Sequence, residues 1–257
     1  MRGWHWIFLF FALLYTAGPL LAWATLDLGF ETNWRATNRE SVGIAPDPAK
    51  TPEAVLQVYA ARAFSWRGIF GVHSWIAIKP PEAGAFTVYQ VIGWHRFFDK
   101  PVLFVKKDLP DRRWYGQAPE ILLDLRGKPA EVVLEKVKAA IAAYPYSDDY
   151  RMWPGPNSNT FTAYVGRAVP ELGLRLPPTA IGKDYLGNSA FLAAAPSGTG
   201  YQFSLFGMVG VLFAEGEGFE MNLLGLSAGF DPFHPALLLP GMGRIALAGV
   251  QVQAKNE

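Results

Sequence analysis

Two side chains that could act together as nucleophile and base stand 85 residues apart in the sequence. Ser158 lies in the stretch WPGPNSNTFTAYVGR, after a Pro-Gly-Pro run and before an apolar helical pattern. A serine hydroxyl needs a base within hydrogen-bond reach, and that base needs an orienting partner. His73 is the candidate base, Gln90 is the candidate orienting residue, and His95 is an alternative to Gln90.

The predicted position of Ser158 at a helix N-terminus suits this chemistry. Backbone N–H groups in the first helical turn have no helical partners, and the helix dipole is positive there. Both features stabilise negative charge on an attacked carbonyl, so the Ser158 N–H would contribute to an oxyanion hole during attack on an amide or ester. The alternative is structural: Asn157 and Ser158 are preferred capping residues, which stabilise a helix by about 1 kcal/mol. For His73 the corresponding alternative is a buried histidine with a purely structural hydrogen bond.

The order of these elements resembles the circularly permuted papain-like fold of NlpC-like peptidases and lecithin–retinol acyltransferase-like proteins. The family's nucleophile motif is Asn-Cys-x-x-Phe at a helix start, and NSNTF at 157–161 matches it with Ser158 in the cysteine position. His73 in GVHSWIAI matches the family's strand histidine. The resemblance covers about residues 70–168 and implies a hydrolase or acyltransferase acting on an envelope component. Serine lacks the thiolate character of cysteine, so the alternative is a non-catalytic papain-like module that binds an envelope ligand or a partner protein.

The family's third polar residue follows the histidine by about a dozen positions, where this chain has Ala85. Gln90 therefore fits that role only if the hairpin after His73 is longer here than in the family. The whole chain also resembles a bacterial family known only as a domain of unknown function, through YPYSDDYRMWPGPNSNTF and LPPTAIGKDYL. This second resemblance implies no activity.

Composition excludes several classes of site. The 257 residues include no cysteine, which rules out disulfides, thiolate zinc sites and a cysteine nucleophile. The net charge of +1 and the lack of a basic aromatic run argue against nucleic-acid binding. No cofactor or metal is predicted: we interpret the acidic residues of two short clusters as exposed turn residues, namely Asp148, Asp149, Glu215, Glu217 and Glu220.

The N-terminus indicates a membrane segment over residues 1–26. Residues 6–23 form an apolar run of about 18 residues, at the lower limit for a spanning helix. Arg2 precedes the run, which predicts a cytoplasmic N-terminus and a single-pass inner-membrane protein with its domain on the periplasmic side. A cleaved signal peptide is the main alternative, because AWA at 22–24 fits a cleavage site. A buried core helix is the third.

The rest of the chain is predicted to form a linker at 27–52 and one extracytoplasmic α+β domain at 53–257. We expect an antiparallel sheet with packed helices and a permuted papain-like core. A hairpin is predicted from strands at 72–78 and 86–92, joined by the Pro-Pro-Glu-Ala-Gly loop at 80–84. One further strand is predicted to begin near Glu53, and the others are predicted at 101–107, 120–125, 200–214, 218–226 and 243–252. The predicted helices cover about 129–144 and 157–168. The expected partners are the membrane, through the N-terminal helix, and a small-molecule, peptide or lipid ligand of the envelope.

Overall fold

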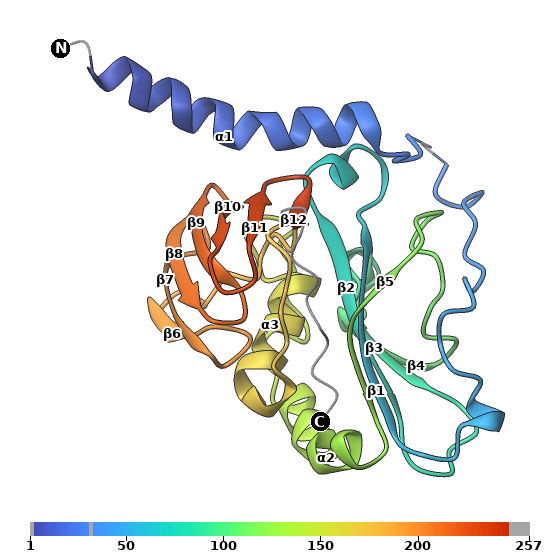
Figure 1. Ribbon diagram of the computed structural model, residues 1–257. Helices are drawn as coiled ribbons and strands as arrows, with labels where there is room; N and C mark the ends of the chain where they lie inside the picture. The colour runs from blue at the N-terminus through green and yellow to red at the C-terminus, as the bar shows by residue number, and fades with distance from the viewer. Residues whose placement is uncertain (1–2, 31–32, 247–257) are drawn as a thin grey trace.

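A computed structural model describes residues 3–30 and 33–246 of the chain. It consists of two antiparallel sheets with two helices between them and a long N-terminal helix above (Figure 1). The mixture of helices and antiparallel sheets agrees with the predicted α+β class. The papain-like permutation stays a prediction.

The first sheet has five strands in the order β4-β3-β2-β1-β5. The hairpin predicted from sequence is present as β2 and β3, which pair antiparallel across the loop at 80–84. The strand predicted near Glu53 is also present as β1 and lies inside the sheet between β2 and β5. The bounds are β1 Val55–Arg62, β2 Val72–Lys79, β3 Thr87–Val91, β4 Leu103–Lys107 and β5 Glu120–Arg126.

Apolar side chains on both faces of this sheet are buried. Because successive side chains on a strand point to opposite faces, Ile76 and Trp75 of β2 enter different clusters. Ile76 packs in the main core with the helices, whereas Trp75 stacks on Tyr59 on the other face, with ring centroids 5.6 Å apart. All positions of β2 are buried for this reason.

Two helices cover the inner face of the first sheet. α2, Lys128–Ala142, has Pro129 in its first turn and buries one stripe that includes Val133 and Val137. α3, Ser158–Ala168, buries Phe161 and Val165 in the same core and packs most closely on β2. The short 3-10 helices are η1 Pro48–Lys50, η2 Ser65–Ile69, η3 Gly93–Phe98 and η4 Pro170–Leu172.

The second sheet is a seven-stranded meander in which every strand pairs with its neighbours in the sequence. The apolar run predicted as one strand at 200–214 is a hairpin, because the chain turns at Phe206 and Gly207, both with positive φ. The last predicted strand, 243–252, is described only as far as residue 246, and the remainder of that prediction lies outside the described residues. The strands are β6 Leu192–Ala194, β7 Gly200–Leu205, β8 Val209–Ala214, β9 Gly218–Leu223, β10 Leu226–Asp231, β11 Ala236–Leu239 and β12 Gly243–Ala246.

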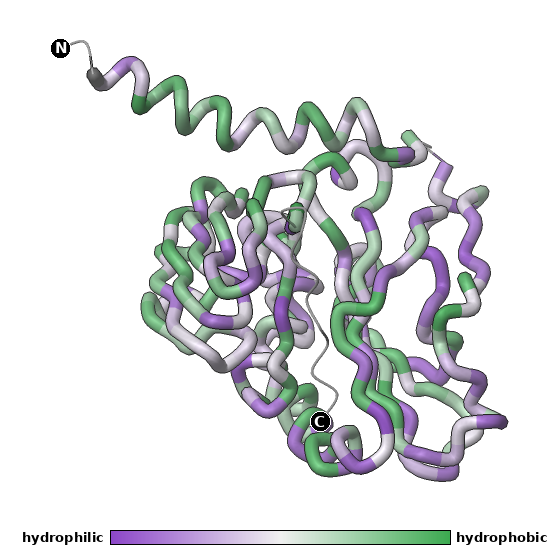
Figure 2. The backbone as a smooth tube through the Cα atoms, viewed as in Figure 1, coloured by the Kyte–Doolittle hydropathy of each residue, from purple (hydrophilic) through white to green (hydrophobic). Residues whose placement is uncertain are grey.

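The N-terminal helix α1 spans Gly3–Thr25 and is apolar along nearly its whole length (Figure 2). A 22-residue segment, Trp4–Thr25, is long and apolar enough to cross a membrane, and only 17% of its most apolar window is buried. That exposure argues against the buried core helix considered above. A signal sequence satisfies the same criteria of length and composition, so the anchor and the signal peptide both stay predictions.

The C-terminal half of α1 packs closely on the domain. Gly18 faces the backbone of Pro240, and a side chain at Gly18 would collide with the Pro240 carbonyl oxygen. The Tyr15 hydroxyl donates a hydrogen bond of 2.8 Å to the Met221 carbonyl in β9. Glycine at position 18 therefore allows the helix to approach the turn between β11 and β12.

The segment predicted as a linker is also held against the domain. The buried carboxylate of Asp111 accepts hydrogen bonds from the Ser41 hydroxyl at 2.6 Å and from the Ile44 N–H at 2.8 Å. Ser41 also forms a β-bridge with Arg112. These bonds fix the path of residues 41–44 along the first sheet's side of the domain.

Candidate functional site

The start of α3 is organised by Asn157, as the capping interpretation predicts. Its side-chain oxygen accepts from the backbone N–H of Asn159 at 2.9 Å and of Thr160 at 3.2 Å. The Thr160 hydroxyl accepts from the Asn157 N–H in return, which completes a capping box. Two of the free N–H groups that an oxyanion would use are thus already occupied by Asn157.

A buried polar cluster joins α3 to β2. The hydroxyl of Ser74 lies 2.7 Å from Asn159 Oδ1 and 2.7 Å from the hydroxyl of Thr162. Asn159 also donates to the Val72 carbonyl at 2.9 Å and to the Ile181 carbonyl at 2.8 Å. The face of β2 that carries Ser74 is therefore the face on which α3 packs.

His73 points to the opposite face of β2. Its ring stacks on Trp114, with centroids 3.6 Å apart and planes 8° from parallel. His73 Nε2 lies 3.4 Å from Gln90 Oε1, so the predicted pair of His73 and Gln90 is brought together. Burial lowers the pKa of His73 to about 3, and the contact with Gln90 opposes that shift only in part. The imidazole is neutral at pH 7.

The structure does not form the predicted dyad of His73 and Ser158. Ser158 is the first residue of α3 and 6% exposed, but no hydrogen bond joins it to His73 among the described residues. The physical reason is strand alternation: Ser74 faces α3, so the adjacent His73 must face away. His95, the alternative orienting residue, lies instead with Nδ1 3.0 Å from the Pro101 carbonyl oxygen.

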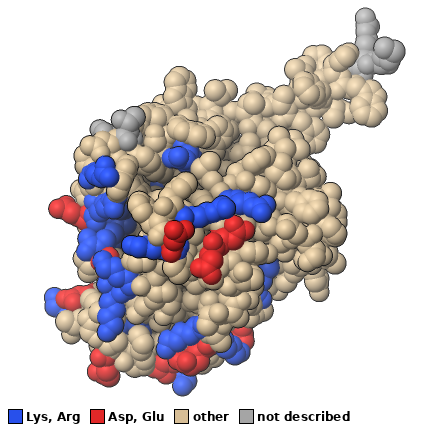
Figure 3. Space-filling view, turned by 180° about the vertical axis from the view of Figure 1, so that it is seen from behind, with Lys and Arg blue, Asp and Glu red and all other residues tan. Residues whose placement is uncertain are grey.

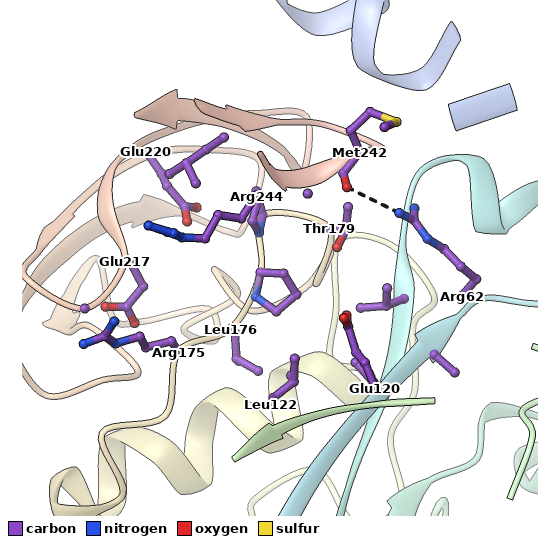
Figure 4. A pocket seen from close by; sticks show the side chains of 18 of the residues that line it. Arg62, Glu120, Leu122, Arg175, Leu176, Thr179, Glu217, Glu220, Met242 and Arg244 are labelled. Atoms are coloured by element: carbon purple, nitrogen blue, oxygen red, sulfur yellow. Dashed lines mark hydrogen bonds between the residues drawn. The ribbon is translucent and has the colours of Figure 1, made fainter. Parts of the chain in front are cut away.

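A cavity of about 420 Å³ lies elsewhere, between the two sheets (Figure 4). Its walls come from β1, β5, the segment 175–179, β9 and the β11–β12 region. Apolar side chains, among them Leu122 and Leu176, alternate with charged ones. None of the four predicted site residues lines it, and its ionisable lining residues are Arg62, Glu120, Arg175, Glu217, Glu220 and Arg244.

Most of these charged groups already have protein partners. Arg62 donates to the carbonyls of Gly68 at 3.2 Å and Met242 at 3.4 Å, and Arg244 donates to Asp231 at 2.9 Å. The other cation, Arg175, and the carboxylate of Glu120 are both exposed. Within residues 3–30 and 33–246, neither Arg175 nor Glu120 makes a side-chain hydrogen bond or ion pair.

Beneath the second sheet lies a buried charge cluster that the sequence analysis missed. Glu217 and Glu220 were expected in exposed turns, but both are buried, 5% and 2% exposed. Lys183 Nζ lies 2.6 Å from Glu220 and 3.3 Å from Asp184. Burial alone would lower the pKa of Lys183, but the two carboxylates raise it above its ordinary value, so the ammonium stays charged. The alternation of polar and apolar residues in YQFSL indicates a strand but does not say which face is buried.

The cluster is completed by hydrogen bonds from other parts of the fold. Asp184 accepts from Asn222 at 2.9 Å and from the Ser227 hydroxyl at 3.3 Å. Arg167 of α3 donates at 2.6 Å to both the Lys183 carbonyl and Gln202 of β7. The part of the chain that the structure describes holds no group of three or more His, Asp or Glu residues arranged for a metal ion.

Comparison with known proteins gives one match. A family model described as a protein of unknown function, DUF3750, matches residues 53–185, just over half of the chain. No curated protein and no solved structure matches. The matched segment runs from the start of the first sheet through α3 to Lys183 and Asp184 of the buried charge cluster.

Proposed function

The chain belongs to the DUF3750 family of proteins of unknown function, and we propose that it is a membrane-anchored, non-catalytic module that binds a small ligand in the cavity between its two sheets. The anchor is α1, and the Arg2 side chain before it keeps the N-terminus in the cytoplasm, so the domain lies in the periplasm. The observation that carries the proposal is the cavity whose walls hold a cation and an anion, Arg175 and Glu120, that have no side-chain partner among the residues the structure describes.

The cavity has the size and lining of a ligand site. Small-molecule sites generally measure about 300–1,000 Å³ and combine apolar walls with a few polar groups. In Figure 4 Arg175 and Glu120 lie on opposite sides, with Leu176 and Leu122 between them. This pattern suits a zwitterionic ligand, such as a peptide with free termini, whose carboxylate meets Arg175 and whose ammonium group meets Glu120.

Catalysis by Ser158 has less support. His73 is neutral, but it faces Trp114 and Gln90 rather than α3. The N–H groups of Asn159 and Thr160 are engaged by the Asn157 cap. A nucleophile without a base in reach reacts slowly, so Ser158 contributes to the helix start and to no reaction.

Binding is tested with free dipeptides as probes. Isothermal titration of the full chain in detergent should detect dipeptides with free termini but not their acetylated, amidated counterparts. Arg175→Gln and Glu120→Gln should each weaken binding by at least about ten-fold, since a charge-assisted hydrogen bond contributes about 1.5–3 kcal/mol. Arg151→Gln, an exposed arginine outside the cavity, is the matched control. Failure of the wild type to bind the free dipeptides, or unchanged affinity in both cavity variants, contradicts the proposal.

The catalytic alternative is tested separately with a serine-directed fluorophosphonate. Wild type and Ser158→Ala should be labelled to the same background level. Labelling of wild type that disappears in Ser158→Ala would show a reactive serine and overturn the non-catalytic assignment.

A further inference from the structure

The second sheet presents its apolar side chains outward. Antiparallel sheets with one solvated face normally place polar residues on that face. Here the strand pairings put Phe203 opposite Val211, Val211 opposite Met221, and Met221 opposite Ala228 on the outer face. The four strands β7 to β10 each contribute three outward positions, and all are apolar or aromatic: Tyr201, Phe203, Leu205, Val209, Val211, Phe213, Phe219, Met221, Leu223, Leu226, Ala228 and Phe230.

The inner face of the same strands carries the polar residues. Gln202 and Ser204 of β7, and Glu220 and Asn222 of β9, are all at most 6% exposed. Gln202, Glu220 and Asn222 bond to groups of the buried charge cluster described above, whereas the Ser204 hydroxyl accepts from the Gly207 N–H at 3.1 Å. A shift of the register by one residue would expose the apolar side chains to the charges and break these bonds, so the outward position of the apolar residues is fixed by the interior.

Most of the outer face is open in the described part of the chain, although Ala228 of β10, the strand that α1 contacts, is fully buried. Tyr201 is 71% exposed, Phe213 is 58% exposed and Phe230 is 53% exposed. The hairpin turns add Phe206 and Leu224, which are also exposed. In Figure 3 the charged side chains gather on the side of the first sheet, and the part of the surface below the projecting end of α1 is almost free of charge. Soluble monomers rarely expose an apolar patch of this extent.

The position of α1 identifies what covers this face. The N-terminal half of α1 projects past the second sheet, on the side away from α3 (Figure 1). Its exposed residues include Trp4, at 79%, and Phe8, at 73%. The helix joins the sheet directly, through the hydrogen bond of Tyr15 with Met221. The two apolar surfaces thus adjoin and lie on one side of the molecule.

We propose that the outer face of the second sheet rests on the lipid bilayer that α1 enters. The sheet lies in the interface and does not span the membrane, because within the described residues β6 and β12 are edge strands, and hydrocarbon cannot satisfy the backbone groups of an open edge. Its aromatic and aliphatic side chains reach the boundary between headgroups and acyl chains, as on the apolar face of an interfacial helix. A bilayer would cover α1 and the outer face of the sheet together, and an apolar face needs no charged groups to contact it.

The absence of cysteine allows this proposal to be tested at single sites in the full chain. Val211→Cys on β8 and Val105→Cys on β4 form a matched pair, since the two valines are 47% and 49% exposed and both lie on strands. Each variant is labelled with an environment-sensitive fluorophore and reconstituted in phosphatidylcholine–phosphatidylglycerol vesicles. Lipids with spin labels on their acyl chains then report contact with the membrane.

Quenching by the spin-labelled lipids should be at least about two-fold stronger at position 211 than at position 105, because interfacial groups lie about 5–10 Å deep. Equal quenching at both positions overturns the proposal. A blue-shifted probe at position 211 without lipid quenching also overturns it and indicates a second copy of the chain as the occupant. The result does not depend on the dipeptide experiment, because position 211 lies outside the cavity.

A charged substitution next to the probe checks the same contact in a second way. Phe213→Glu places a carboxylate at an exposed position, so the fold is retained and circular dichroism verifies it. With the probe at 211, this variant should lose most of the excess lipid quenching. Retention of the full signal would contradict insertion of the face. Val132→Glu on α2, at a position as exposed as Phe213, is the control that should change nothing.

Discussion

The two sheets of this protein differ in where they place their apolar side chains. In the first sheet apolar side chains pack on both faces, and its interior strand β1 is almost wholly buried. In the second sheet, β7 and β9 bury polar side chains beside the apolar Leu212 and Ala214 of β8, and most apolar side chains of the outer face are exposed. The hydrophobic effect therefore stabilises the first sheet within the protein. On its inner side the second sheet is held largely by ion pairs and hydrogen bonds, and its exposed apolar surface is the one proposed above to contact lipid.

The largest expected effect is loss of the central cation of the second sheet. Lys183→Met leaves Glu220 and Asp184 buried without their counter-charge. Removal of one partner from a buried pair destabilises by about 3–5 kcal/mol. Urea unfolding of the full chain in detergent measures the change. The double variant Lys183→Met/Glu220→Gln should lose less, and a double variant no more stable than the single one would show that Glu220 is not the partner that matters.

A second experiment compares the apolar residues of the two sheets. Leu56→Ala in β1 empties a fully buried site and should cost about 2–5 kcal/mol. Val211→Ala in β8 removes two methyl groups from an exposed site and should cost under about 0.5 kcal/mol. The same unfolding assay gives both values. Similar losses would mean that the outer face of the second sheet is packed within the protein.

The smallest effect concerns pH and the first sheet. The pKa of His73 is lowered in the folded state, so below pH 6.5 the unfolded chain binds a proton that the folded chain rejects. The contribution of neutral His73 to the free energy of unfolding is therefore fully present above this pH and is lost as the pH drops towards 3. The contribution between pH 7 and pH 5 is about 2 kcal/mol. His73→Phe retains an aromatic ring beside Trp114 and should remove that part of the pH dependence, whereas an unchanged pH profile would show that His73 is accessible to protons.

Local patterns predicted the first sheet well. The alternation around His73 and the Pro-Pro loop that follows predicted the hairpin, and the apolar stripe with Pro129 predicted α2. Asn157 was among the expected capping residues, and it is the N-cap of α3. These elements are determined by residues close together in the sequence, so a single sequence is enough to predict them.

The site was harder to predict because it depends on which face each strand buries. Ser74 and His73 are adjacent, and only the packing of α3 decides which of them faces Ser158. In the same way, the alternation Tyr201, Gln202, Phe203 does not say that the glutamine points inward. Arg175 and Glu120 of the cavity come from segments 55 residues apart, with no motif to link them.

The docked segment between α1 and β1 has a mechanical consequence. Asp111 holds Ser41 and Ile44, and α1 is itself bound to the second sheet through Tyr15. A domain joined to α1 by a flexible linker alone would reorient freely relative to that helix. These two attachments restrict rotation of the domain relative to α1. Under the membrane anchoring proposed above, the mouth of the cavity therefore keeps a constant orientation and a constant distance from the bilayer.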